Sequence, residues 1–410
     1  MKLQAPRGTF DVLPGDGRRR LRLQREGAAL LDRAGYEPFE TPIFEETELF
    51  ARGVGEATDI VQKEMFTFED KAGSSLTLRP EATAAMCRAY VEHGMHKLAQ
   101  PVKLWTWGPF FRHEAPQAGR FRQFTQLDVE ALGSDDPSLD AELILLLAEF
   151  IEGAGAGPAR LRVSSLGTPE TRAEYLGELT SFLRAREGEL SEEVRERLDQ
   201  NPLRAFDSDH PGTRAVMKEA PRLLDRLDPE DAEHFADVRA LLDAAGMEYE
   251  VDSTLVRGLD YYTRTVFEYE SERLGAQAAL GGGGRYDRLI EELGGPATPG
   301  VGWAAGIERI LLASPSGDEH SPRVFVSFAA SDRRAHAFDF ARALRAAGIR
   351  AEVEQAGRSL KGQLRQADRI GARAVVIFGD GIDVKNMDTG NQERVGGTDE
   401  AVELVKETLV

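Results

Sequence analysis

The stretch "FRHEAPQAGRFRQFTQLDVE", residues 111–130, carries heavy charge for a segment that otherwise predicts a β-hairpin. Alternate residues of a strand share a face, which places Gln126, Asp128 and Glu130 on one side. Leu127 and Val129 fall on the other side and can enter a core. The "APQAG" tip supplies the bend through its proline and glycine. The polar face is expected to continue over more of the hairpin: Arg120, Arg122 and Phe124 on this strand, and Arg112 and Glu114 on the preceding one.

This charged face has two interpretations. It can be a solvated sheet surface, since charge on strands commonly serves solvation. Alternatively, it can be a binding site, because arginine forks match phosphate oxygens. Glutamate and glutamine on the same face could also hold an ammonium or an imidazole. The mixture of polar types and the aromatic residues among them favour a face that binds a triphosphate and a small cationic amine together.

The surrounding sequence predicts a mixed α+β unit. Helices are expected over about 17–34, 81–93 and 140–155, and strands over 63–70, 76–80, 101–114 and within 250–271. The interval from about 165 to 245 contains charged helical segments without strand alternation, which indicates a helical insertion. A Ser-, Pro- and Gly-rich linker at 314–322 marks a domain boundary. Beyond it, strand and helix patterns alternate as β-α-β-α-β, typical of a small α/β domain with parallel strands.

Composition limits the classes of partner. The net charge is −19, which opposes nucleic-acid binding over the whole surface, yet residues 323–410 hold 14 Lys+Arg against 13 Asp+Glu. RNA contact would therefore be confined to patches. The single cysteine rules out an intramolecular disulfide and fits a reducing compartment. Neither a signal peptide nor a membrane span is expected, so a cytoplasmic location is predicted. The scattered histidines predict no protein-bound metal.

Two further motifs are candidates for ligand contact. In "LVRGLDYYTRTVFE", residues 255–268, Arg257 and Gly258 precede a strand, and the adjacent tyrosines Tyr261 and Tyr262 can be half core and half site. In "LGGGGRYDRL", residues 280–289, the glycines suit either a close backbone approach to a ligand or a flexible turn. No Gly-Lys-Ser/Thr follows them, so this is not a Walker loop.

A third motif is "GVGWAAGIERI", residues 300–310. The small residues Ala304, Ala305 and Gly306 would let a flat ring pack on the strand that carries them. Arg309, at the start of the following helix, can cover a phosphate or pair with Glu308, and the sequence leaves both open.

Taken together, these motifs resemble a known family. "FRHE…GRFRQF" is similar to motif 2 of class II aminoacyl-tRNA synthetases, and "GVGWAAGIERI" to their motif 3. "LVRGLDYYTRTVFE", "GGRYDRL" and "LTLRPEATAA" resemble signatures of the histidyl-tRNA synthetase family, and the region from "SLKGQLRQADRIGARAVVIFG" onward resembles its anticodon-binding domain. The likeness runs in order over nearly the whole chain, and only the combination of motifs is specific.

The resemblance implies a fold and an activity. The fold would be a class II antiparallel sheet with flanking helices and a helical insertion, in a catalytic domain at 1–320, followed by an α/β anticodon-binding domain at 322–410. The activity would be histidine–tRNA ligation by a homodimer, which uses ATP with Mg²⁺, forms histidyl-adenylate from L-histidine and passes the histidyl group to tRNA(His). The alternative is a non-catalytic, synthetase-like regulatory subunit of histidine biosynthesis, but such proteins typically lack the C-terminal domain.

The resemblance also assigns residues. Arg257 and Arg112 would be catalytic cations. The ATP site would comprise Arg112, Glu114, Arg120 and Arg309. The histidine site would comprise Glu81, Thr83, Gln126, Glu130, Arg257, Tyr262 and Tyr286. Gln117 and Arg122 would contact the tRNA acceptor stem. Ala115, Thr125 and Arg288 depart from the family pattern, and Ala115, where arginine is usual, bears on the strength of the acceptor-stem contact.

Overall fold

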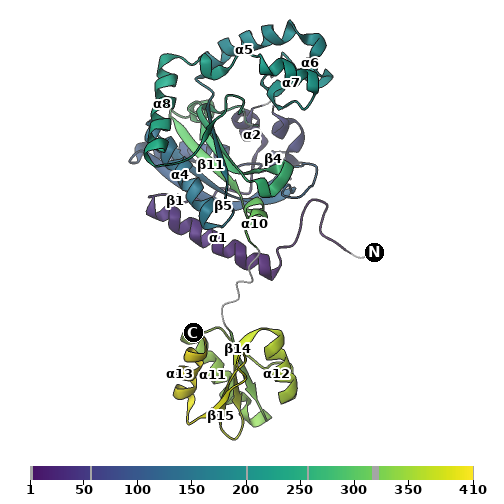
Figure 1. Cartoon of the computed structure of the whole chain (residues 1–410), viewed down its shortest axis with the longest axis vertical. Helices are drawn as coiled ribbons and strands as arrows, with labels where there is room; N and C mark the ends of the chain where they lie inside the picture. Colours follow the sequence, from purple (N-terminus) through teal and green to yellow (C-terminus); the bar gives the residue numbers. More distant parts are fainter. Residues whose placement is uncertain (1–2, 56–57, 200–201, 256–257, 316–322, 410) are drawn as a thin grey trace. The chain divides into compact units, whose positions relative to one another are not determined.

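The computed structural model describes residues 3–55, 58–199, 202–255, 258–315 and 323–409. The chain divides into two compact units, Met1–Ser316 and Gly317–Val410. Figure 1 shows the helices and strands of each unit. Arg257, the predicted catalytic cation, lies outside the described residues.

A mostly antiparallel sheet organises the first unit. Within the described residues it has eight strands in the order β1-β5-β6-β11-β10-β9-β7-β8, and only the edge pairs β1/β5 and β7/β8 are parallel. The strands span β1 Glu37–Pro38, β5 Val102–Phe111, β6 Gln123–Leu132, β7 Arg160–Ser165, β8 Glu250–Val251, β9 Thr263–Glu270, β10 Ala279–Arg285 and β11 Gly300–Gly306. A separate three-stranded sheet contains β2 Phe44–Glu46, β3 Phe66–Glu69 and β4 Ser75–Leu78.

Helices pack against the large sheet. Those of the first unit are α1 Pro14–Arg33, α2 Thr47–Val54, α3 Thr83–Glu92, α4 Pro137–Gly153, α5 Pro169–Arg184, α6 Glu192–Arg197, α7 Pro211–Lys218, α8 Pro229–Ala244, α9 Leu289–Glu292 and α10 Ile307–Ala313. On one face, α1, α4 and α8 share a core with alternate residues of the strands, among them Leu127, Val129 and Trp303. The opposite strand face is therefore left to carry the polar residues.

The predicted helical insertion is helical in the structure. Between β7 and β8 the described residues form α5 to α8 and short 3-10 turns, and they contribute no strand there. Leu179, Leu183 and Val216 pack these helices into a second core, which also contains Tyr262 and Tyr286. Arg172 of α5 donates to the Tyr262 carbonyl at 2.9 Å. The insertion thus supports the backbone of a predicted site residue.

The second unit has the predicted parallel strands and more. Strand β12 Arg323–Phe328 pairs in parallel with β13 Ala351–Val353 and with β14 Ala372–Phe378. Helices α11 Arg334–Ala346 and α12 Leu360–Arg369 connect them. The sequence pattern did not assign three later elements: β15 Ile382–Asn386 and β16 Gln392–Val395, which are antiparallel, and α13 Thr398–Leu409. Among the described helices of either unit, none has the length and apolar character to cross a membrane.

The opening hairpin forms, but its strands are shorter than expected. β5 and β6 pair from Val102↔Leu132 to Phe111↔Gln123, so Arg112, Glu114, Arg120 and Arg122 belong to the connection. The strand pairing ends there because the next N–H groups bond to other segments: His113 donates to the Glu64 carbonyl and Arg122 to the Gly8 carbonyl. Farther along, Gly119 adopts a positive φ of 75° in the turn. The connection stays ordered: the Arg112 N–H donates to the Arg122 carbonyl, and Gln117 and Arg120 form an isolated bridge.

Candidate active site

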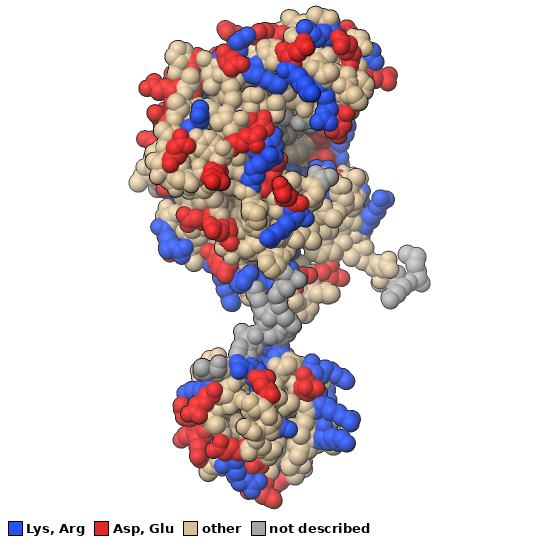
Figure 2. Space-filling model, in the orientation of Figure 1, with Lys and Arg blue, Asp and Glu red and all other residues tan. Residues whose placement is uncertain are grey.

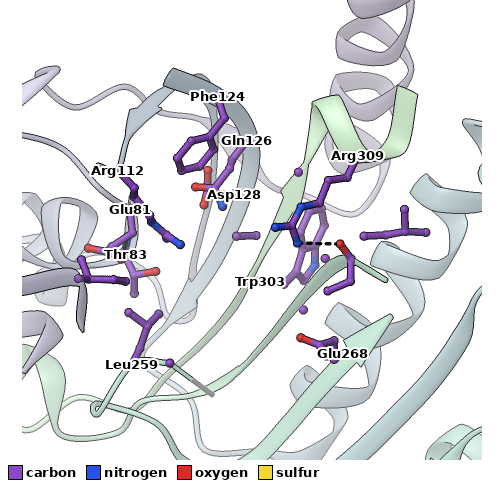
Figure 3. A pocket seen from close by; sticks show the side chains of 18 of the residues that line it. Glu81, Thr83, Arg112, Phe124, Gln126, Asp128, Leu259, Glu268, Trp303 and Arg309 are labelled. Carbon is purple, nitrogen blue, oxygen red and sulfur yellow. Dashed lines mark hydrogen bonds between the residues drawn. The ribbon is translucent and has the colours of Figure 1, made fainter. Parts of the chain in front are cut away.

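A cavity lies on the polar face of the large sheet. Its walls come from the start of α3, the β5–β6 connection, the segment before β9, and strands β6, β9, β10 and β11, with α10 at the rim (Figure 3). Nine of the residues to which the resemblance assigned a ligand line it: Glu81, Thr83, Arg112, Glu114, Arg120, Gln126, Tyr262, Tyr286 and Arg309. Segments separated by more than two hundred residues therefore meet in one place.

Glu81 is held at the N-terminus of α3. Its carboxylate accepts from the backbone N–H groups of Thr83 at 2.8 Å and Ala84 at 3.0 Å. It thereby caps a helix end whose first N–H groups have no partner within the helix. Burial nevertheless raises the pKa of Glu81, and the helix N–H groups and the nearby Arg112 act against that rise. A buried carboxylate that is fixed in this way is suited to meet a cationic group.

Glu130 lies against the cavity wall, two residues after Asp128 on the same face of β6. It accepts from Thr83 Oγ1 at 2.6 Å and from the hydroxyl of Tyr286. Burial raises its pKa to about 8, against the effect of these two donors and with a further rise caused by Glu81. A ligand group that donates a further hydrogen bond to this carboxyl would lower its pKa and favour its ionised form.

Two glycines make room for Glu130 and its neighbours. A Cβ on Gly302 of β11 would lie 1.6 Å from Glu130 Oε2, and a Cβ on Gly283 of β10 would lie 1.9 Å from the Gly302 carbonyl. The glycine run at 281–284 is thus a central strand and not a turn, which settles the alternative left open by the sequence. Gly281 and Gly282 line the cavity, so ligand and backbone can approach closely there.

Arg112 stands between the acidic groups and the other arginines. Its Nε donates to the Pro80 carbonyl at 2.9 Å, and its guanidinium lies 5.4 Å from the ring centroid of Phe124. These contacts fix the plane of the guanidinium and leave its remaining N–H groups near the cavity. Its charge acts on the pKa values of Glu81 and Asp128 on one side and of Arg309 on the other.

The far end of the cavity is arginine-rich. Arg309 of α10 donates to the carbonyls of Gly119 at 2.9 Å and Ala279 at 3.0 Å, which ties the connection between β5 and β6 to β10. Arg120 forms an ion pair with Glu114 in that connection. Burial lowers the pKa of Arg309, and the positive charge of Arg120 lowers it further. Crowded, partly desolvated guanidinium groups of this kind favour a multiply charged anion.

Glu308 does not need Arg309 as its partner. Its carboxylate accepts from Arg20 of α1 at 3.2 Å and from the Thr125 N–H at 2.9 Å. Arg20 also donates to the Thr125 hydroxyl, so this departure from the family pattern is accommodated by a bond to α1. Of the two roles left open for Arg309, the position at the cavity fits the anion-binding one.

The two residues assigned to the tRNA acceptor stem lie elsewhere in the connection. Arg122 donates to the Glu114 carbonyl at 3.3 Å and packs against Gly8, whose carbonyl accepts from the Arg122 N–H. Gln117 sits in the turn closed by its bridge to Arg120. Within the described part of the chain, neither belongs to the residues that line the cavity.

The sequence interpretation assigned no ligand to several lining residues. Asp128, Glu268, Tyr261 and Trp303 all border the cavity, and Phe124 stacks below Arg112. Period-two alternation had placed Asp128 on the same face as Gln126 and Glu130, but no ligand was assigned to it. Glu268 could not be found in this way, because only the pairing of Gly282 with Glu268 brings it to the cavity.

Comparisons with known proteins agree along the whole chain. The family model described as "Histidyl-tRNA synthetase" matches residues 8–310, and that described as "Anticodon binding domain" matches residues 324–408. The chain is 48% identical to a protein of Rubrobacter xylanophilus named "Histidine--tRNA ligase", over 97% of both chains. It is 45% identical to the protein of that name from Halothermothrix orenii, over 96% of this chain and 97% of the other.

Solved structures give the same result. The crystal structure of apo histidyl-tRNA synthetase from S. aureus superposes with a TM-score of 0.82 at 36% identity, over 99% of this chain and all of that one. A Bacillus halodurans structure titled as an ATP phosphoribosyltransferase regulatory subunit/histidyl-tRNA synthetase superposes with a TM-score of 0.68 at 22% identity and 92% coverage of this chain, which shows a shared fold alone. With matched family models over both units, the chain belongs to the histidyl-tRNA synthetase family.

Proposed function

We propose that the chain is a histidine–tRNA ligase, which joins histidine to ATP as histidyl-adenylate and then transfers the histidyl group to tRNA(His). One observation carries the proposal furthest: a single cavity holds buried carboxyls at one end and clustered arginines at the other, within the region matched by the family. A regulatory subunit without catalysis would not need both ends, and the full-length relatives at 44–48% identity are all named as ligases.

Histidine would occupy the acidic end. Its α-ammonium would face Glu81 and Gln126, with Thr83 beside them, and its imidazole N–H would face Glu130, Tyr286 and Tyr262. The raised pKa of Glu130 supports this placement, since a buried carboxyl gains most from a ligand that donates to it. Arg257, known from the family pattern alone, is proposed as the cation beside the reacting carboxylate.

ATP would occupy the arginine-rich end. Arg112 would bind the α-phosphate, with Arg120 and Arg309 on the terminal phosphates and Glu114 near the adenine. Arg120 forms an ion pair with Glu114, and this pair would break when the guanidinium binds the phosphates. Mg²⁺ is proposed to arrive on the phosphates, whose oxygens are the ligands it prefers.

The chemistry is an in-line displacement at phosphorus. A histidine carboxylate oxygen attacks the α-phosphorus, and pyrophosphate leaves with the electrons of the broken P–O bond. Little bond-making is asked of the protein, which aligns the two reactants and neutralises charge on the transferring group. Arg112 stands where both substrates would meet, which supports its role as a catalytic cation.

Transfer to tRNA would use both units. On the second unit, Lys and Arg gather along the side that carries α12, and acidic residues gather on the opposite side, over α13 (Figure 2). The exposed basic residues of that side are Arg358, Lys361, Arg365 and Arg369. Such a separation explains how a nearly neutral domain can contact RNA phosphates through one face. Gln117 and Arg122 are proposed acceptor-stem contacts, as members of an ordered connection next to the cavity.

A homodimer and a cytoplasmic location complete the proposal. Apolar side chains near the N-terminus stay exposed in the single chain, with Phe10 at 41%, Val12 at 41% and Leu13 at 66%. Phe10 also contacts Phe121 of the β5–β6 connection, with ring centroids 4.6 Å apart. Covering these side chains with a second copy would bring the dimer contact close to the proposed site.

Pyrophosphate exchange tests the function directly. Exchange of labelled pyrophosphate into ATP should depend on L-histidine and should be negligible with glutamine or phenylalanine, because a site built to pair ammonium and imidazole donors discriminates by about 10⁴ or more. Charging of tRNA(His) transcript should follow in the same preparation. Absence of histidine-dependent exchange from folded protein would overturn the proposal, and comparable exchange with several amino acids would overturn the histidine pocket.

A further inference from the structure

Asp128 is a buried acid of the cavity that the assignments above leave without a role. It lies in the middle of β6, it is 2% exposed, and it lines the cavity (Figure 3). Its Oδ2 atom is buried and has no hydrogen-bond partner among the described residues. A buried carboxylate oxygen without a donor is costly, so its presence calls for a partner from outside the chain.

A neighbouring acceptor, the side-chain oxygen of Gln126, also lacks a hydrogen-bond donor. Gln126 precedes Asp128 by two residues on the same face of β6, and its Oε1 is also buried without a donor. Glu81 faces the same region from the start of α3, and its charge acts on Asp128. Three acceptor side chains from two elements thus surround one part of the cavity. Ala304 lies opposite Asp128 on β11, so the carboxylate is not covered from that side by a long side chain.

An α-ammonium group carries three N–H donors, which this arrangement can satisfy. We propose that Asp128 binds the α-ammonium group of the amino-acid substrate, as the third acceptor beside Glu81 and Gln126. The inference rests on the proposed function and assigns a specificity-determining residue to it. It distinguishes the ammonium end of the ligand from the imidazole end, where Glu130 is already engaged by Thr83 and Tyr286.

A purely structural role for Asp128 is the competing explanation. The buried guanidinium of Arg79 is near enough to act on its charge, and so is Arg112. Arg79, however, donates to the carbonyls of Pro109 and Thr41 and to the Thr41 hydroxyl, at 3.0 to 3.1 Å. Within the described residues Asp128 Oδ2 has no hydrogen-bond partner, and the hydrogen bonds of Arg79 and Arg112 go to other acceptors. The Nε and Nη1 groups of Arg79 are thus engaged by Pro109 and Thr41, and no hydrogen bond in the described part of the chain joins the guanidinium to Asp128 Oδ2.

The electrostatic surroundings add a second readout. Burial raises the pKa of Asp128 well above its usual range, Glu130 and Glu81 raise it further, and Arg79 and Arg112 act against the rise. A cation bound next to this carboxyl lowers its pKa again, so that binding expels its proton. Proton release upon binding therefore reports on Asp128 without any catalytic measurement.

The test compares two ligands and two proteins. Titration calorimetry with the full chain measures the affinity for L-histidine and for 3-(imidazol-4-yl)propionate, which lacks the α-ammonium group. For the wild-type protein the loss of this group should cost affinity. In Asp128→Asn, which keeps the shape but not the charge, histidine should bind about 10- to 100-fold more weakly, as expected for a lost charge-assisted hydrogen bond. The propionate should bind about as before, so the ratio of the two affinities falls.

Controls separate the possible outcomes. Glu268→Gln removes another carboxylate of the same cavity and should leave the affinity ratio near the wild-type value. Calorimetry in two buffers of different ionisation enthalpy should show fewer protons released on histidine binding by Asp128→Asn, and Asp128→Ser should repeat both results if the first variant folds poorly. An unchanged ratio with unchanged proton release refutes the role of Asp128. A wild-type protein that does not bind histidine at all refutes the proposed function instead.

Discussion

Replacing Glu130 by glutamine should make the stability of the first unit less dependent on pH. Glu130 is 1% exposed, and its raised pKa of about 8 compares with 4.5 for an exposed glutamate. Because the folded-state pKa is raised, the stability that this group contributes is fully present below pH 4.5 and is lost as the pH rises through about 8. Glutamine has nearly the same shape and no charge to bury.

The size of the effect follows from these two pKa values. Between pH 6 and pH 9 the unfolded glutamate is already ionised, whereas the folded carboxyl gives up its proton only near pH 8. The free energy of unfolding of the wild-type protein therefore falls over about two pH units, between pH 6 and the folded-state pKa, by about 1.4 kcal/mol per unit. The wild-type protein should thus lose about 3 kcal/mol of stability relative to Glu130→Gln. The neighbouring groups Thr83, Tyr286 and Glu81 are present in both proteins, so most of their own contributions cancel.

Urea unfolding followed by tryptophan fluorescence can measure this difference. All three tryptophans, Trp105, Trp107 and Trp303, belong to the first unit, so the signal does not report the unfolding of the second. The free energy of unfolding of each protein is determined at pH 6 and pH 9 without ligands. If the difference between wild type and variant is the same at both pH values, Glu130 does not change its protonation in this range and the burial argument is wrong.

Three other changes test separate parts of the proposal. Arg257→Ala should slow single-turnover adenylate formation by about 100-fold or more, since it removes one aligned charge stabiliser, and a near-wild-type rate would contradict the assignment. Gly302→Ala places a Cβ 1.6 Å from Glu130 Oε2 and should raise the KM for histidine in exchange, whereas Gly188→Ala, which meets nothing within 4 Å, should not. A fragment ending at Ser316 should still form adenylate but charge tRNA(His) with a raised KM, and unimpaired charging would show that the C-terminal unit does not carry the tRNA contact.

Sequence patterns were sufficient for most helices and for the central strands. Apolar periodicity located α1, α4 and the strands β5 and β6, because each of these buries one face in a shared core. Sequence patterns did not predict β7, β15 and β16, because these strands are short and carry many polar residues. For such strands the pairing with neighbours, and not the local pattern, decides the structure.

The site was predicted to a similar extent and with a similar limit. Nine residues named from motifs do line one cavity, and Glu130 lies against its wall. The expected strand positions of Arg112 and Arg120 were wrong, because strand pairing stops at Phe111 and Gln123. Alternation put Asp128 on the polar face but gave it no role. Glu268 was not assigned to the site because a residue's exposure to the cavity depends on sheet register and on small neighbours such as Gly302 and Ala304.

The order of charges along the cavity has a consequence for how a substrate enters. Glu130, Glu81 and Asp128, whose pKa values are all raised, influence one another at one end. Arg112 acts on Asp128 and on Arg309, and Arg120, Glu114 and Glu268 act on Arg309 at the other end. A free amino acid is itself a dipole, with its ammonium and carboxylate only a few ångströms apart. The guanidinium groups favour the orientation in which the carboxylate points toward them and the ammonium toward the acceptors Glu81, Gln126 and Asp128. The walls therefore turn an incoming zwitterion toward the phosphate end before any single hydrogen bond is made.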